Sequence, residues 1–415
     1  MVTRLHHSIR RVLILVTTLG SITSVAYGSG FGIFTQGASA LGQADAVVAH
    51  PDGPSAIFFN PALMNKLPGT QIELGTTLLF PSRHYTAPDG YSAKTQETVF
   101  TPSTFYVTHA FNDSISAGLG VFNPFGLGTD WGDNWGGAYG GKYIATKSEL
   151  TSWNINPAVS FRIIPALTVA AGLDVVLLDA TLKNTSLSTT YGIPTAFDVA
   201  QKFTGSGNGV GYNFGLYVAL PLDISLGATY RSQVNIDVDG DFTASVLPQS
   251  VKGTTLVKLP QQVTAGLAYK PADNFTIEAG MRWEDWSSFK QLPIQFASNP
   301  YGLTAVNTLR DWHGTYAFNI GGKYRINDSF SLMAGYLHGW NPVPDSTFEP
   351  GIPDSDTNLY TVGGEARFSA VTLSLAYGYQ AQCDRYKSSA TYSGAGTGTY
   401  STYIHVVGLS LGYKF

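Results

Sequence analysis

The chain has 415 residues, a formal net charge of −4 at pH 7, 13% aromatic residues and only 13% charged residues. A weakly negative chain without a basic cluster argues against nucleic acid as a partner. Cys383 is the only cysteine, so no internal disulfide can form, and it matches no metal or redox motif. We therefore expect neither a metal nor a cofactor.

Residues 1–28 are typical of a secretory signal peptide. Three arginines precede an apolar run over residues 12–25, and small residues lead to a cut after Gly28. The alternative is an N-terminal transmembrane helix, but a run of about 14 residues is short for a span that needs roughly 20. We expect an exported protein from which this segment is removed.

Residues 29–68 do not follow the strand pattern of the rest of the chain. They are rich in glycine, alanine and compact turn signals, and show little alternation. A disordered periplasmic tail is the alternative, but the segment is too apolar and too low in charge for a solvated tail. We therefore expect a plug, or hatch, inside the structure that follows.

Residues 69–415 are predicted to form an all-β fold, an antiparallel transmembrane barrel. Short and long connections alternate along this part, and most of the short ones carry Pro, Asn or Asp, which favour tight turns. The short connections are residues 112–114, 164–166, 221–223, 271–274, 327–328 and 369–370. Six short turns imply about fourteen strands, and an even number with short periplasmic turns is typical of bacterial outer-membrane barrels. One or two secreted β-sandwiches, the alternative, do not predict this rhythm.

The last strand shows the clearest alternation. Its odd row from Tyr403 to Phe415 is apolar and aromatic, whereas Gly408, Ser410 and Gly412 on its even row are small. The first row is predicted to face lipid and the second the interior. Charged residues of other strands fall on the small or polar row, which fits an interior position because a charge facing mid-bilayer costs about 2–4 kcal/mol.

Five short motifs follow one another along the mature chain. They are Ser29-Gly30-Phe31, residues 37–42, Asn60-Pro61-Ala62, Asn123-Pro124 and residues 342–356. Each is weak alone, but in this order on a barrel of about fourteen strands they resemble the FadL-type family of outer-membrane transporters. The family moves long-chain fatty acids, and in some branches aromatic hydrocarbons, without hydrolysing anything. The terminal Phe415 also resembles the signal read by the barrel-assembly machinery, an expected partner during biogenesis.

The resemblance implies passive uptake of a hydrophobic small molecule across the outer membrane of a Gram-negative bacterium. Outer loops would capture it, an internal apolar pocket would hold it, and movement of the N-terminal segment around Ser29, Gly30 and Phe31 would release it. Asn60, Pro61 and Ala62 would hold the hatch against the wall. Candidate capture residues are Ile193, Phe197, Phe203, Val246 and Leu247. The alternative, that these only pack the loops together, stays open.

Family members also have a kinked third strand through which the ligand leaves sideways into the membrane. Gly118, Gly120, Asn123 and Pro124 lie in and just after the third predicted strand. Glycine weakens a strand interior and proline cannot donate to a ladder, so a local defect of the wall is expected there. An ordinary strand end beside a loop is the alternative.

A carboxylate ligand requires a cation near the pocket, because an unpaired buried anion is costly. Strand parity places Arg231, Lys258 and Arg282 in the lumen, on neighbouring strands. Pairing of these cations with interior acids is the structural alternative. Strand parity does not decide between the two roles.

Two rival functions have requirements that the sequence does not favour. A general diffusion porin needs an open polar lumen, which the apolar hatch segment disfavours. An outer-membrane lipase or protease needs a nucleophile beside a histidine, and none of the eight histidines belongs to such a motif. We expect a monomer surrounded by outer-membrane lipid and lipopolysaccharide, and the sequence does not identify the hydrophobic ligand.

Overall fold

The computed structural model describes residues 30–415 except 298–300, 303 and 391–393. The expected signal peptide and Ser29 lie outside this part. None of the helices within it is long and apolar enough to cross a membrane.

The strands form one closed antiparallel barrel of 14 strands. They are β1 (Thr70–Thr86), β3 (Ser103–Ala110), β4 (Ile115–Phe122), β6 (Lys147–Ile164), β7 (Leu167–Leu187), β8 (Asp198–Leu220), β9 (Ile224–Arg231), β12 (Gln262–Ala272), β13 (Phe275–Glu284), β16 (Thr315–Arg325), β17 (Phe330–Gly339), β18 (Thr357–Phe368), β19 (Val371–Gln382) and β21 (Gly398–Lys414). The last strand closes the barrel, because Tyr413 of β21 pairs with both Val371 of β19 and Ile72 of β1. The prediction of a barrel of about fourteen strands is confirmed.

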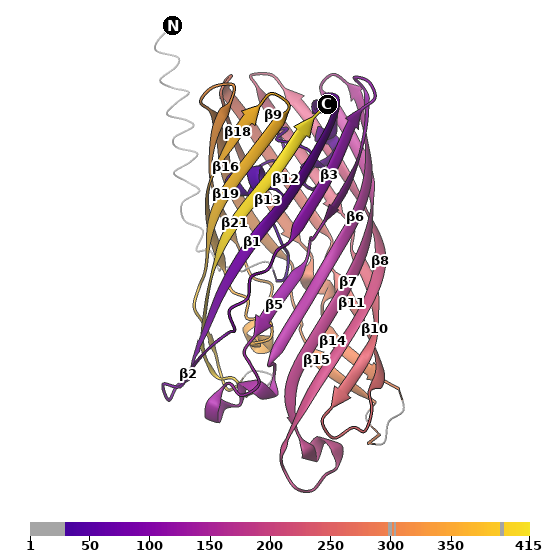
Figure 1. Ribbon diagram of the computed structural model, residues 1–415, viewed down its shortest axis with the longest axis vertical. Helices are drawn as coiled ribbons and strands as arrows, with labels where there is room; N and C mark the ends of the chain where they lie inside the picture. Colours follow the sequence, from indigo (N-terminus) through magenta and orange to yellow (C-terminus); the bar gives the residue numbers. More distant parts are fainter. Residues whose placement is uncertain (1–29, 298–300, 303, 391–393) are drawn as a thin grey trace.

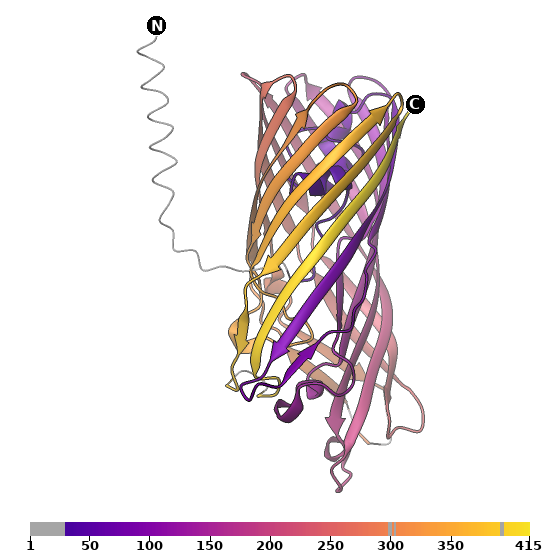
Figure 2. The same ribbon diagram turned by 60° about the vertical axis from the view of Figure 1, so that its left-hand side comes forward.

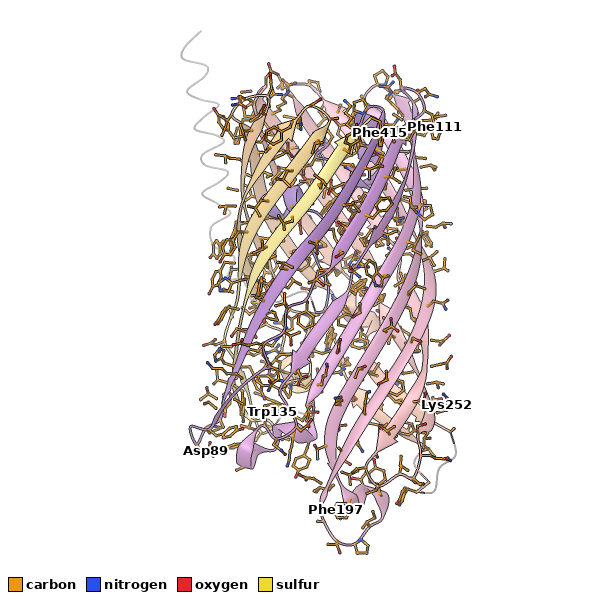
Figure 3. The ribbon with its side chains drawn as sticks, in the orientation of Figure 1. Asp89, Phe111, Trp135, Phe197, Lys252 and Phe415 are labelled. Atoms are coloured by element: carbon orange, nitrogen blue, oxygen red, sulfur yellow. The ribbon has the colours of Figure 1, made fainter. Side chains whose placement is uncertain are left out.

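Seven further strands extend the wall at one end of the barrel. They are β2 (Ser92–Lys94), β5 (Gly126–Asp130), β10 (Val234–Ala244), β11 (Val251–Leu259), β14 (Gln291–Phe296), β15 (Ala305–Leu309) and β20 (Arg385–Lys387). Phe111 and Phe415 mark the end with the short turns, while Asp89, Trp135 and Phe197 mark the end with the long loops (Figure 3). Short periplasmic turns are the rule in bacterial barrels, so the long loops face outward from the cell.

Alternate residues of each strand face lipid or the interior, as period two requires. On β21, Leu411 is 50% exposed whereas Ser410 is 6% exposed. The Ser410 hydroxyl accepts a hydrogen bond from the backbone N–H of Ala38, at 2.9 Å. A Cβ atom on Gly408 would lie 2.9 Å from a methyl of Leu41. The small row of the last strand therefore receives the N-terminal segment.

The hatch, residues 30–68, fills the interior toward the short-turn end (Figures 1 and 2). It contains the helices α2 (Ala38–Gly42) and α3 (Ala56–Phe59) and the 3-10 helix η1 (Pro61–Lys66). Glycines of the wall let its backbone approach closely. A Cβ atom on Gly321 would lie 1.9 Å from the carbonyl oxygen of Gln43, and one on Gly227 would lie 2.0 Å from that of Val48.

Candidate functional site

The third strand of the barrel is broken after β4. Residues up to Val121 pair with both neighbours, but β5, which resumes at Gly126, pairs with β6 and not with β3 among the described strands. The Asn123 side chain bridges the two neighbours at the break. Its Oδ1 accepts from the N–H of Ser103 at 2.9 Å, and its Nδ2 donates to the carbonyl of Ser152. An asparagine amide thus replaces two ladder bonds where the strand leaves the wall.

The predicted weak points of the third strand separate into two kinds. The ladder continues without interruption through Gly118 and Gly120. A Cβ atom on Gly118 would lie 2.7 Å from a methyl of Ile57, so this glycine makes room for the hatch. The break itself lies at Asn123 and Pro124.

The N-terminal segment of the hatch borders the break from inside. The N–H of Gly126 donates to the carbonyl of Phe31, and the N–H of Ile33 donates to the carbonyl of Pro124, both at 2.9 Å. These bonds satisfy backbone groups that an unbroken third strand would have given to its neighbour. The segment therefore substitutes for part of the wall.

A cavity of about 410 Å³ lies beside the break. Its inner side is formed by side chains in the lumen, among them Phe31, Phe125 and Val406, all buried. Its lining also includes Val99, 50% exposed, and Trp153, 39% exposed, which belong to the outer face of the wall. The cavity thus reaches from the lumen to the lipid-facing side, and its volume falls within the range usual for small-molecule sites.

Two ionisable residues line this cavity among the described residues. Arg83 was not singled out in the sequence, and Asp354 belongs to a predicted motif but was not predicted as a site residue. Arg83 of β1 donates from Nη1 to the carbonyl of Gly128 at 2.8 Å. Asp354 accepts from the N–H of Gly30 at 2.7 Å and from Nε2 of Gln382 at 3.1 Å. Burial raises the pKa of Asp354 to about 7. The sequence did carry a signal for Arg83: it lies on the same row of β1 as Pro81, the row that faces inward.

The predicted head-group cations occupy different environments. Arg231 forms an ion pair with Asp174, which is 1% exposed, and its guanidinium lies 5.5 Å from the ring centroid of Phe58. Arg282 lies 4.1 Å from the ring centroid of Phe34, and within the described chain it has no ion pair. Both arginines line a small cavity of about 40 Å³ under the hatch. Arg231 is therefore paired directly with an acid, whereas Arg282 has no direct ion pair among the described residues.

The hatch residue Asp45 faces the same small cavity. Both of its carboxylate oxygens are buried without a hydrogen-bond partner in the described structure. Burial raises its pKa to about 7, although the charge of Arg282 opposes this shift. Because the raised pKa of Asp45 disfavours its ionised form, Asp45 does not fully offset the positive charge of Arg282.

The prediction that Lys258 faces the lumen is wrong. It lies on the outward row of β11 together with Lys252, which points away from the barrel at its flank (Figure 3). The outward row of β10 carries the exposed residues Asp237 and Asp239. Charges do not face lipid, so this part of the sheet stands beyond the membrane. Outside the membrane a charged side chain can lie on the outward row of a strand. The position of Lys258 could therefore not be predicted from its charge.

The predicted capture residues do not form one group. Phe203 is not in a loop: it lies on β8, faces inward and is 3% exposed. Ile193, Val246 and Leu247 are half-buried against the aromatic core of the loop end. Phe197 is 45% exposed near the tip of its loop (Figure 3). Phe203 therefore packs inside the barrel wall and does not take part in a loop surface. Of the five predicted capture residues, only Phe197 presents a large exposed apolar surface.

Asn60 joins the hatch to the wall. Its Nδ2 donates to the carbonyls of Val48 and Leu216, at 2.8 and 2.9 Å, the second of which belongs to β8. Its Oδ1 accepts from the N–H of Ala62 at 3.1 Å and so caps η1, with Pro61 at the first helical position.

Glu278 of β13 provides a second anchor that was missed in the sequence. Its carboxylate accepts from the N–H groups of Val48 and Ala49, at 2.6 and 2.9 Å, and contacts Nδ1 of His50 at 2.7 Å. Its side chain is fully buried. One wall carboxylate thus holds three successive hatch residues.

Comparison with known proteins identifies the family. A family model described as outer membrane protein transport protein (OMPP1/FadL/TodX) matches residues 19–415. A long-chain fatty acid transport protein of Escherichia coli is 24% identical, over 91% of this chain and 94% of the relative. The crystal structure of a Pseudomonas aeruginosa FadL homologue has a TM-score of 0.83 at 18% identity, covering 93% of this chain and all of that chain. The toluene transporter TodX of Pseudomonas putida has a TM-score of 0.75 at 18% identity, covering 93% and 99%. The solved structures share the fold, and the match of the family model over nearly the whole chain shows that the protein belongs to the OMPP1/FadL/TodX family of outer-membrane transport proteins.

Proposed function

We propose that the protein takes up a long-chain fatty acid or another hydrophobic molecule across the outer membrane through the cavity at the third-strand break. The protein resides in the outer membrane of a Gram-negative bacterium and belongs to a family of transporters, so it is not an enzyme. One relative is named for long-chain fatty acids and a structural neighbour for toluene, and both are hydrophobic compounds.

The observation that carries the proposal is that one cavity touches both faces of the wall. Phe31 and Phe125 line it from the lumen, and Val99 and Trp153 line it from the lipid side. A solute that leaves along this path passes from an apolar cavity into lipid. Exposing apolar surface to water would cost about 25 cal/mol per Å². Lateral exit avoids that cost.

The hatch supplies the gate in this proposal. Phe31 and Ile33 bond to the edges of the break and also line the cavity. Withdrawal of this segment would therefore enlarge the cavity and free the edges of the third strand together. The remaining hatch fills the lumen, so the passage stays closed to ions and polar solutes.

The test narrows the outer mouth of the cavity. Val99→Trp adds bulk at the mouth, while Val159→Trp adds the same bulk at an outward position of β6, 57% exposed, that does not line the cavity. Uptake of labelled oleate and toluene is measured in cells that lack their own transporter of this family. Val99→Trp is expected to slow uptake of the transported compound severalfold and Val159→Trp to leave it unchanged. Equal uptake by both variants, with equal barrel content in the membrane, would refute exit at the break.

A further inference from the structure

Arg83 lies where the proposed route crosses the wall. With Pro81, Phe100 and Gly128 it lines both the main cavity and a second cavity of about 60 Å³, whose lining continues to Lys147 on β6. Arg83 therefore borders both cavities, and among the residues that do so it is the charged one.

The height of Arg83 in the membrane follows from the register. It pairs with Thr402 of β21, next to the outward Tyr403. Tyr403 and His405 lie in one aromatic group with Tyr379, in which ring centroids are 5.4 to 6.4 Å apart. Aromatic girdles mark the membrane interfaces of such barrels. Arg83 thus stands near the outer interface, at the level of lipid head groups.

The guanidinium of Arg83 forms no direct ion pair in the described chain, although the charge of Asp354 acts on it from farther away. No ion pair within 4.0 Å is formed by Arg83, and its one side-chain hydrogen bond goes to a neutral carbonyl, that of Gly128. The other ionisable residue of the main cavity, Asp354, is held by Gly30 and Gln382 instead. In the smaller cavity, Glu149 is paired with Lys147 at 2.7 Å. The nearby carboxylates are therefore already engaged.

We propose that Arg83 is a subsite for the carboxylate of an amphiphile whose hydrocarbon tail fills the 410 Å³ cavity. The assignment rests on the proposed function and adds the chemical class of its ligand. An arginine carries five N–H donors in a planar fork that matches a carboxylate in two parallel bonds, and one donor is used here. A half-buried cation without a direct ion pair is unfavourable. A ligand that supplies the anion therefore gains an interaction that an alcohol or a hydrocarbon cannot make.

The competing role for Arg83 is structural, as a cap on the free carbonyl of Gly128 at the edge of β5. Two variants separate these roles. Arg83→Gln keeps an amide donor for that carbonyl and removes the charge, and Arg83→Lys keeps the charge. Arg325→Gln is the matched control, because it removes an exposed arginine at the short-turn end. Binding of oleate and of oleyl alcohol to each purified protein is measured by displacement of a fluorescent fatty-acid probe.

Arg83→Gln is expected to weaken oleate binding about tenfold, as for loss of one hydrogen bond to a charged group. Binding of oleyl alcohol should be unchanged, and Arg83→Lys should keep the preference for oleate. Equal loss of acid and alcohol, or no loss of either, would overturn the assignment while leaving the transport proposal intact. Wild-type protein that binds neither compound would count against the transport proposal itself.

Discussion

Removing the Glu278 carboxylate should release the hatch without unfolding the barrel. In the native protein this group accepts hydrogen bonds from the N–H groups of Val48 and Ala49 and contacts His50. Its backbone lies in β13, whose ladder with β12 and β16 does not involve the side chain. Glu278→Ala therefore removes three hatch contacts from a wall that stays intact.

The size of the effect follows from the groups left behind. Two buried N–H groups lose their acceptor, and each such loss costs about 1–3 kcal/mol. A mid-range total of about 4 kcal/mol corresponds to a roughly thousandfold larger fraction of molecules with a released hatch. Glu278→Gln keeps one acceptor oxygen and should fall between the wild type and the alanine variant. Both variants also remove a buried carboxylate, whose burial is itself unfavourable. This gain makes the net free-energy loss smaller than the total given above.

Amide hydrogen exchange of peptides covering residues 44–52 measures this release directly. Exchange at Val48 and Ala49 should be strongly accelerated in Glu278→Ala, while the strands keep their protection and the folded barrel keeps its mobility in a denaturing gel. Unchanged exchange at these two amides would show that the carboxylate does not anchor the hatch. Accelerated exchange throughout the strands would show instead that it supports the barrel.

Three further outcomes are expected. Gly321→Ala should displace the hatch, because its Cβ would lie 1.9 Å from the carbonyl oxygen of Gln43, whereas Gly322→Ala, whose nearest contact would be 3.1 Å, should not; exchange of the hatch amides distinguishes them, and equal exchange would contradict the reasoning. The stability of the folded protein should include a contribution from Asp354 that weakens as the pH rises. Burial raises the pKa of Asp354 from 3.8 to about 7, although the hydrogen bond from the N–H of Gly30 opposes this shift, so the folded state holds the proton more tightly, and its contribution is complete below pH 3.8 and lost as the pH rises through 7. Thermal unfolding across this pH range should show the trend and lose it in Asp354→Asn; a trend that persists in the variant would implicate another group. Purified protein in planar bilayers should show little steady ion conductance, because the hatch fills the lumen, and large open-channel currents would favour a porin.

The barrel could be predicted because its determinants are local. A strand that faces lipid must alternate over every second residue, and a hairpin needs turn residues at its tip, so each strand and turn carries its own signal. The row ending at Phe415 and the turn at residues 112–114 are examples. The same reasoning failed for Lys258, because the membrane ends before β11 and the rule about charge ends with it.

The site could be predicted only in part. Asn123 and Pro124 announce a break, since proline cannot join a ladder. That the break borders a cavity depends on Phe31, which lies about ninety residues away in the sequence and covers it through backbone bonds that any residue can make. Because these hydrogen bonds join backbone groups, they do not require particular residue types, and the sequence carries no signal for them.

The sequence by itself determined the class of the molecule: a barrel of about fourteen strands with an apolar segment ahead of it, because burial in lipid constrains every residue of a strand separately. Only the tertiary structure decided which charged side chains have a direct partner and which do not. Arg231 pairs with Asp174, Glu278 accepts from Val48, and Arg83 forms no direct ion pair among the described residues. These outcomes depend on distances between segments remote in sequence, because the attraction between two charges weakens as their separation grows.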